Sequence, residues 1–290
     1  MNTGFLLDST LRVSTPLIFA AMGGLLSERA GITNIALEGM MLIGALAGAV
    51  ATFFSHSPWI GLLAAVAAGA ALAAIYGAFA ITLRANQIVA GMAINMLALG
   101  LTPFCCKLLF DVTGSTPTIP FIERLQIVPL WLALVAVLGC FVFFRWMRGG
   151  LRLSFAGENP AALHAAGISV SRIHWLALLA GGALAGIGGA TLSICLSSSF
   201  SRNMTAGRGF IVLAALIFGK WKPIPAALAC LLFGFAEAVQ IRLQGSAIGG
   251  VQIPVQLIQV LPYLLTVVVL AGFVGRSRAP AALGVPFDKD

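Results

Sequence analysis

Charged residues are scarce in this sequence, and their scarcity excludes a water-soluble globular protein. Only 9% of the 290 residues are charged and 60% are hydrophobic, whereas soluble domains carry about 25% charged residues. So few charges cannot solvate the surface of a 30 kDa globule. The natural solvent for such a surface is lipid. We therefore expect one membrane domain over residues 1–290, with no soluble domain attached.

Motifs of catalysis and of metal binding are also missing. The string nearest to a GxxxxGK[ST] phosphate loop, FGKW at 218–221, lacks the leading glycine and the Ser or Thr that would hold magnesium. No GxSxG hydrolase elbow occurs. The histidines and cysteines show no metal-ligand spacing. We expect no catalytic residue, no metal and no cofactor in this chain.

Two further patterns are absent, a cleavable leader and a basic nucleic-acid-binding patch. The start, MNTGFLLDSTLR, has neither the basic beginning nor the cleavage site of a signal peptide, so we expect it to be mature sequence. The net charge of +8 comes from 17 Lys and Arg spread between apolar runs. This spread is a topology signal and does not indicate nucleic-acid binding.

Apolar runs of helical length are what the sequence contains instead. A helix needs about 20 such residues to cross a bilayer, and the runs predict an all-α bundle of about nine crossings, within a range of eight to ten. The seventh run has a short apolar core, so it is either a full crossing or a half-helix beside a watery vestibule. The predicted crossings are 11–27, 34–54, 59–83, 87–110, 128–145, 173–197, 205–220, 224–243 and 256–274.

Lys and Arg gather on one side of these crossings. Eleven of the 17 fall on the side that carries the 146–172 loop, and six fall on the other side. The side richer in Lys and Arg faces the cytoplasm. We therefore expect a multi-pass protein of the inner membrane, with the N-terminus outside and the C-terminus in the cytoplasm. The same count favours a full crossing for 205–220.

The cytoplasmic loop 146–172 predicts a short helix. Asn159 is a typical N-cap, and Pro160 suits the first helical position. Ala161 begins a helix-forming stretch that Gly167 can end in a left-handed conformation. Such a helix is either an ordinary capped connector or a lever through which a partner tilts the two attached crossings.

The sequence of this loop, GENPAALHAAGIS at 157–169, resembles the coupling segment of permeases in the ribose, branched-chain amino acid and nucleoside family of ABC importers. Most of the chain carries similar stretches. The first and last of those that follow look most like the simple-sugar and nucleoside branch of the family. They are LLSERAGITNIALEGMMLIGA at 25–45, GMAINMLALGL at 91–101, GGALAGIGGA at 181–190 and NMTAGRGFIVLAALIFGKWKPIPAAL at 203–228.

The resemblance implies a helical permease subunit that translocates a nucleoside or a simple sugar by alternating access. It also implies three partners: a second permease in a heterodimer, ATPase subunits that hold ATP and magnesium, and an extracytoplasmic substrate-binding protein. The coupling segment would dock on the ATPase through Glu158, Asn159, Pro160, Ala161, His164 and Gly167.

Polar side chains inside crossings are costly and mark candidate sites. Gln87, Gly91 and Asn95 recur every four residues and share one face of a helix. They either line a path for a neutral polar solute or hydrogen-bond to neighbouring helices. The sequence leaves both interpretations open.

Glu237 and Gln240 form a second polar face, which raises a rival function. Glu237 either contacts substrate or pairs with an arginine such as Arg242. A proton- or ion-coupled secondary transporter would need a titratable group near the midplane, and Glu237 is the plausible candidate. Uptake that depends on ATP would favour the importer, and uptake driven by a proton gradient alone would favour the rival.

Polar residues at the ends of crossings complete the candidate set. We expect Glu28, Arg29, Asn34 and Glu38 to form a fixed ion network at the cytoplasmic gate. On the other side, Phe200, Asn203 and Thr205 are expected to bound the substrate entrance or contact the binding protein. A weak similarity between the stretches from Asn34 and from Asn203 suggests an inverted repeat, because these segments would cross in opposite directions.

Overall fold

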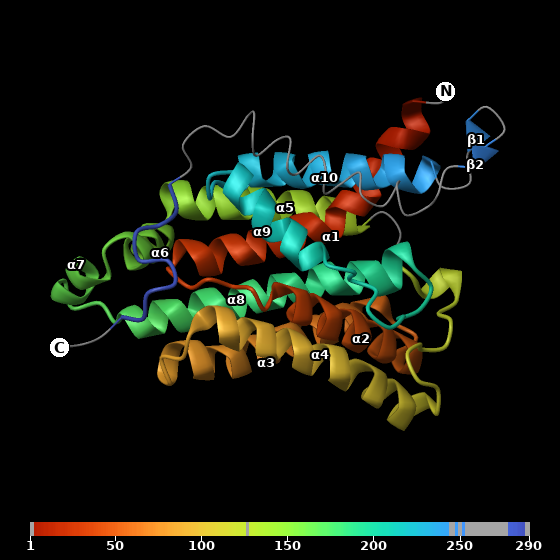
Figure 1. Ribbon diagram of the computed structural model, residues 1–290, viewed down its shortest axis with the longest axis horizontal. Helices are drawn as coiled ribbons and strands as arrows, with labels where there is room; N and C mark the ends of the chain where they lie inside the picture. Colours follow the sequence, from red (N-terminus) through yellow and green to blue (C-terminus); the bar gives the residue numbers. More distant parts are fainter. Residues whose placement is uncertain (1–2, 126–127, 244–246, 249–250, 253–277, 288–290) are drawn as a thin grey trace.

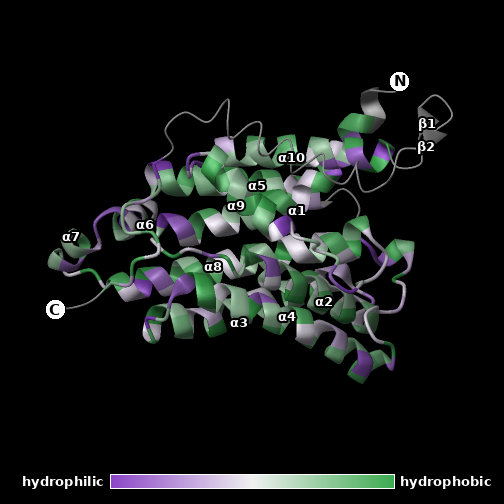
Figure 2. Ribbon diagram, viewed as in Figure 1, coloured by the Kyte–Doolittle hydropathy of each residue, from purple (hydrophilic) through white to green (hydrophobic). Residues whose placement is uncertain are grey.

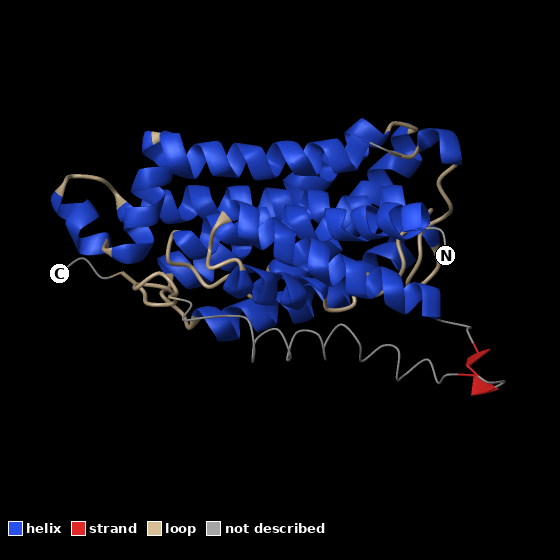
Figure 3. Ribbon diagram, turned by 90° about the horizontal axis from the view of Figure 1, so that it is seen from above, coloured by secondary structure: helices blue, strands red, loops and turns tan. Residues whose placement is uncertain are grey.

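The computed structural model describes residues 3–125, 128–243, 247–248, 251–252 and 278–287 of the chain. These residues form a bundle of helices that run along the long axis of the molecule (Figure 1, Figure 3). The prediction of a helical membrane protein is confirmed, because seven segments are long and apolar enough to cross a bilayer. The predicted crossing at 256–274 lies outside the described residues.

The crossings fall close to their predicted positions, and the segment 87–110 has the predicted bounds. Five-residue π-helical turns continue α3 and α8, and two strands of two residues each pair beyond α10. The elements in chain order are α1 (Thr3–Arg29), α2 (Leu37–Ser55), α3 (Pro58–Gly77), η1 (Ala78–Thr82), α4 (Gln87–Phe110), η2 (Phe121–Glu123), α5 (Val128–Trp146), α6 (Arg148–Glu158), α7 (Pro160–Ala165), α8 (Val170–Thr191), η3 (Leu192–Leu196), α9 (Arg208–Phe218), α10 (Pro223–Leu243), β1 (Ala247–Ile248) and β2 (Val251–Gln252).

Helix α9 is the short member of the bundle. Its 11 residues, at about 1.5 Å each, cover about half of a hydrocarbon core that is about 30 Å thick. It lies among α1, α2 and α10, and it starts inside the bundle (Figure 1). The seventh predicted crossing is therefore a half-helix, preceded by an irregular segment that returns the chain from the end of η3.

The two ends of the bundle differ. The start of α1 lies at one end, with the loop between α4 and α5, whereas α6, α7 and residues 278–287 lie at the opposite end (Figure 1). Hydrophobic residues run along the helices, and hydrophilic residues concentrate in the loops at the two ends (Figure 2). We call the end with α7 the α7 end and the other the α1-start end.

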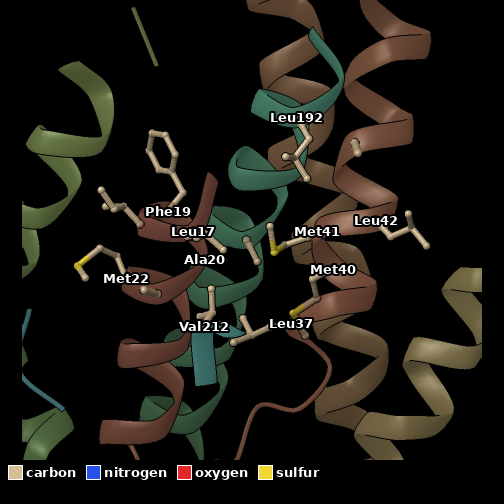
Figure 4. Close-up of a cluster of buried hydrophobic side chains, with 14 of the residues drawn as sticks. Leu17, Phe19, Ala20, Met22, Leu37, Met40, Met41, Leu42, Leu192 and Val212 are labelled. Carbon is tan, nitrogen blue, oxygen red and sulfur yellow. The ribbon is translucent and has the colours of Figure 1, made fainter. Parts of the chain in front are cut away.

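Small residues let α2, α3 and α8 pack with their backbones in contact. A Cβ atom added to Gly44 would lie 2.5 Å from the Cα of Gly186, and one added to Gly189 would lie 2.8 Å from the backbone nitrogen of Ala45. Close approach of this kind is how helices associate in lipid, where apolar burial gives little driving force. Beside these contacts, buried side chains of α1, α2, α9 and η3 gather into the apolar core (Figure 4).

At the α1-start end, the loop after α4 is clamped to the segment after η3. The Ile119 N–H donates to the Ser198 carbonyl at 2.7 Å, and the Arg202 N–H donates to the Gly114 carbonyl at 2.6 Å. The hydroxyl of Thr116 accepts from the backbone N–H of Phe200 at 2.9 Å. These hydrogen bonds hold the α4–α5 loop against the irregular segment that leads into α9.

Candidate functional site

The carboxylate of Glu38 lies at the N-terminal ends of two helices. Glu38 belongs to the first turn of α2, and its two oxygens accept the backbone N–H groups of Gly207 at 2.8 Å and of Gly209 at 2.6 Å, at the start of α9. A helix N-terminus carries unpaired N–H donors and a partial positive charge. Glu38 is only 4% exposed. Its carboxylate therefore pairs the free N–H groups at the start of α9 in a place that water does not reach.

Close backbone approach makes this arrangement possible. Gly207 has φ +84°, in the left-handed region that favours glycine. A Cβ atom on Gly209 would lie 2.6 Å from the Cα of Glu38. A larger residue at position 209 would separate the starts of α2 and α9, and one at position 207 would strain the backbone.

An ion pair forms beside this junction. Arg208, the first residue of α9, pairs with Glu237 of α10, and the side chains are 20% and 16% exposed. Arg208 also donates to the Met204 carbonyl at 2.8 Å. A cation at a helix N-terminus is unfavourable, and the carboxylates of Glu38 and Glu237 offset it. Glu237 does pair with an arginine, as the sequence suggested, but the partner is Arg208 and not Arg242.

The amide face of α4 binds the backbone of the α1–α2 turn, residues 30–36. Gln87 Oε1 accepts the N–H of Thr33 at 2.7 Å. Asn95 Oδ1 accepts the N–H of Gly39 at 2.8 Å, and Asn95 Nδ2 donates to the Ile35 carbonyl at 3.0 Å. Gly91, between them, leaves space for the same turn, since its Cβ would lie 3.1 Å from the Cβ of Ile35. In this conformation Gln87 and Asn95 hold the turn in place by hydrogen bonds, and a role of this face in the solute path stays a prediction.

The predicted ion network at the end of α1 does not form within the described residues. Glu28 instead accepts from the indole N–H of Trp221 at 2.6 Å. The Arg29 guanidinium stacks 4.6 Å from the centre of the Phe144 ring. Asn34 donates to the Ser27 hydroxyl at 3.1 Å. These residues are separate anchors of the α1–α2 turn, because hydrogen bonds to indole, hydroxyl and backbone groups replace the expected ion pairs.

The three residues predicted at the outer entrance have different environments. Phe200 and Thr205 are fully buried, so neither touches a soluble partner in this conformation. Asn203 is exposed and has φ +55°. Gln240, predicted on the face of Glu237, is half-buried on α10.

The short helix predicted in the 146–172 loop is confirmed as α7. Asn159 Oδ1 accepts the N–H of Ala162 at 3.0 Å, Pro160 is the first residue, and Gly167 has φ +76° beyond the end. Ala161 and His164 are exposed, while Leu163 is buried against Ala156 and Val170. Helix α7 projects past the ends of the long helices (Figure 3), as docking would require, and its coupling role stays a prediction.

Residues 280–287, which we call the tail segment, join α6 and α7 to the α1–α2 turn. The Ala282 N–H donates to the Gly157 carbonyl at 2.8 Å, and the Gly284 N–H donates to the Gly31 carbonyl at 2.9 Å. The N–H of Ala281 donates to the Glu158 carboxylate at 3.4 Å. The Phe287 ring lies 5.8 Å from the His164 ring.

Sequence reasoning missed α6, the tail segment and the long-range partners of Glu28, Glu38 and Glu237. For the buried acids a signal was available. An acid and an arginine within apolar crossings are expected to find partners, and Arg208 lies between two glycines at the start of the shortest apolar run. In the described part of the chain, no three His, Cys, Asp or Glu residues gather to hold a metal ion.

Long apolar helices, a half-helix that starts inside the bundle, and buried charges at its start are features of a membrane transport protein. Residues 6–270 match the family described as "Branched-chain amino acid transport system / permease component". The chain belongs to this family, and it is a permease subunit of an ABC transporter.

Relatives of known name are similar over nearly the whole chain. The guanosine ABC transporter permease protein NupQ of Bacillus subtilis is 38% identical over 98% of this chain and 96% of its own length. The nucleoside ABC transporter permease protein NupC of Lactococcus lactis is 38% identical over 95% of this chain and 94% of its own. The putative glucose ABC transporter permease protein TsgC13 of Haloferax volcanii is 34% identical, with 97% and 94% covered.

The same two bacterial strains each contain a second matching permease. NupP, from Bacillus subtilis, is 26% identical over 87% of this chain and 75% of its own length. NupB, from Lactococcus lactis, is 23% identical over 96% and 83%. The chain is thus similar to both named permeases in each strain, and more similar to NupQ and NupC.

Proposed function

We propose that this protein is the permease subunit of an ATP-driven importer that carries a nucleoside across the inner membrane. The observation that carries the substrate class is the similarity of nearly the whole chain, at 38% identity, to permeases named for guanosine and nucleosides. A simple sugar is the second candidate, favoured by the 34% identity to a permease named for glucose. The solute is moved and not chemically changed.

The α7 end of the bundle faces the cytoplasm in this proposal. It carries more Lys and Arg, which is the bias of cytoplasmic loops. The α1-start end, with its clamped loops, faces the extracytoplasmic binding protein, and exposed Asn203 lies on this side. The N-terminus is then outside and the C-terminus inside, with about nine passes in total, of which α9 and the segment before it make one.

Partners complete the transporter. A second, different permease forms a heterodimer with this chain, as the two matching permeases in each of two strains suggest. ATP and magnesium bind to separate ATPase subunits, and this chain holds no cofactor. The translocation path then lies between the two permeases and opens alternately to each side.

Helix α7 receives the force of the ATPase and transmits it through two contacts. The first is the end of α6, where a Cβ on Gly157 would lie 3.0 Å from the Gly31 backbone nitrogen. The second is the tail segment, bonded to Gly157 and Gly31. Both reach the α1–α2 turn, and α2 begins after that turn with Glu38 on the start of α9. ATP and solute must each favour one of two states, because a ligand with equal affinity for both shifts nothing.

The test is uptake in proteoliposomes that contain the purified complete transporter. We expect uptake of labelled guanosine that requires ATP and the binding protein and is lost with an ATPase-dead partner. Uptake driven by a proton gradient without ATP would establish the secondary transporter instead. Uptake of glucose without uptake of guanosine would show that the substrate is a sugar and not a nucleoside, and the conclusion that the protein is part of an ATP-driven importer would stand.

A further inference from the structure

An apolar groove opens on the surface of the bundle near its α7 end. It has a volume of about 530 Å³, within the range of about 300–1,000 Å³ typical of ligand sites. Helices α5, α6 and α8 line it through Gly139, Phe143, Leu153 and Leu176, and Leu26 of α1 contributes to the lining. These residues offer almost no hydrogen-bonding groups, so the groove suits a hydrocarbon chain.

Three arginines lie on the helices that form the groove. Arg152 of α6 lines it directly. Arg148 lies one turn before Arg152, and Arg172 lies one turn before Leu176, so each shares a helix face with a lining residue. All three are exposed, and none has an ion-pair partner among the residues that the structure describes.

Helix α6 has the composition of a helix that lies at a membrane surface. Leu151 and Phe155 are 58% and 47% exposed. They lie on the same side of α6 as Arg148 and Arg152, three residues from one or the other. Basic residues beside exposed apolar ones are typical of helices that lie in the headgroup region. Trp146, 71% exposed at the end of α5, adds an aromatic ring of the kind found at this depth.

We propose that this groove is a binding site for an anionic phospholipid. One acyl chain would occupy the apolar groove, and the headgroup phosphate would meet the guanidinium groups of Arg152, Arg148 and Arg172. A membrane lipid matches both halves of the site, since it supplies a hydrocarbon chain and a negative charge at the right depth. An apolar protein surface matches only the groove, because it would bury these arginines without partners.

Two variants test the arginines and the apolar groove separately. Arg152→Gln removes one charge from the mouth, and each arginine near an anionic surface contributes about a fivefold increase in affinity. Gly139→Leu fills the groove, because a Cβ on Gly139 meets nothing within 4 Å. Gly100→Leu is the matched control, since Gly100 is exposed on α4, outside the groove, and its Cβ also meets nothing within 4 Å.

The experiment uses the complete transporter in nanodiscs with photoactivatable phosphatidylglycerol or phosphatidylcholine, and maps the cross-links by mass spectrometry. We expect phosphatidylglycerol adducts on α5, α6 and α8, reduced about fivefold by Arg152→Gln, lost in Gly139→Leu and unchanged in Gly100→Leu. Equal labelling by both lipids, or equal labelling of all variants, would overturn the site. Phosphatidylglycerol adducts that are absent from these helices in the wild-type transporter would also overturn it. None of these outcomes depends on which solute is transported.

Discussion

The carboxylate of Glu38 accepts the backbone N–H of Gly209 at 2.6 Å, across 171 positions of sequence. This single contact joins the first turn of α2 to the first turn of α9, the half-helix that packs against α1, α2 and α10. Because the second oxygen of Glu38 accepts from Gly207, one carboxylate binds two backbone N–H groups at the start of α9.

Glu38→Gln tests this junction. The amide keeps one acceptor but presents NH₂ to one of the two N–H groups, so one donor loses its partner. Hydrogen bonds to a charged group contribute about 1.5–3 kcal/mol, and we expect the free energy of unfolding to fall by about 2 kcal/mol. Thermal unfolding of the detergent-solubilised protein measures this. An unchanged melting temperature would show that α9 is held by other contacts.

The ion pair between Arg208 and Glu237 is suited to a double-mutant cycle. Removing one partner leaves the other charge partly buried and unpaired, which costs about 3 kcal/mol for a buried pair. We expect Arg208→Gln and Glu237→Gln each to destabilise strongly, and the double variant to cost less than their sum. Arg242→Gln is the control, because Arg242 is exposed on the same helix as Glu237. Additive losses would contradict the pair.

The amide face of α4 is predicted to act through structure. Asn95→Leu leaves the Gly39 N–H and the Ile35 carbonyl without their partner, at about 1–3 kcal/mol for each buried group. We expect a lower melting temperature and an unchanged KM for the solute in the protein that remains folded. Met96→Leu, on the exposed side of α4, is the control. A raised KM at constant stability would restore the interpretation that Asn95 lines the solute path.

Local features of this fold were predictable from sequence, and long-range features were not. The bounds of α4 and the capped helix α7 follow from hydropathy, Asn159 and Gly167, which act within a few residues. Helix α6 was missed because its apolar residues alternate with polar ones and form no continuous run, although Leu151 and Phe155 have helical spacing. The partners of Glu38 and Glu28 lie 169 or more positions away, so no local pattern could identify them.

Capping of α7 is predicted to matter for coupling. A six-residue helix is marginal by itself, and the loss of an Asn N-cap costs about 1 kcal/mol. We therefore expect Asn159→Ala to lower solute uptake per ATP hydrolysed while insertion and global stability stay near wild type. Asn86→Ala is the matched control, because Asn86 caps α4 by the same contact, to Ile88 and Val89. Equal effects of the two variants on uptake per ATP would rule out a specific role of α7.

The tail segment gives the sharpest test of how force reaches the α1–α2 turn. A chain that ends at Arg278 lacks the bonds from Ala282 to Gly157 and from Gly284 to Gly31, so only the packing of α6 would still join α6 and α7 to the turn. Coupling free energies between sites correspond to about 5- to 150-fold effects, and we expect uptake per ATP to fall at least about fivefold.

Phe287→Ala distinguishes the two contacts of the tail segment, the one with α7 and the one with the α1–α2 turn. It removes the aromatic contact with His164 and leaves the backbone bonds to Gly157 and Gly31 in place. If α7 pulls on the tail segment through this ring, Phe287→Ala uncouples partially and the truncation uncouples further, with basal ATP hydrolysis retained in both. If both variants transport with wild-type stoichiometry, the force reaches the turn through α6 alone, and the tail segment serves only to cover this end of the bundle.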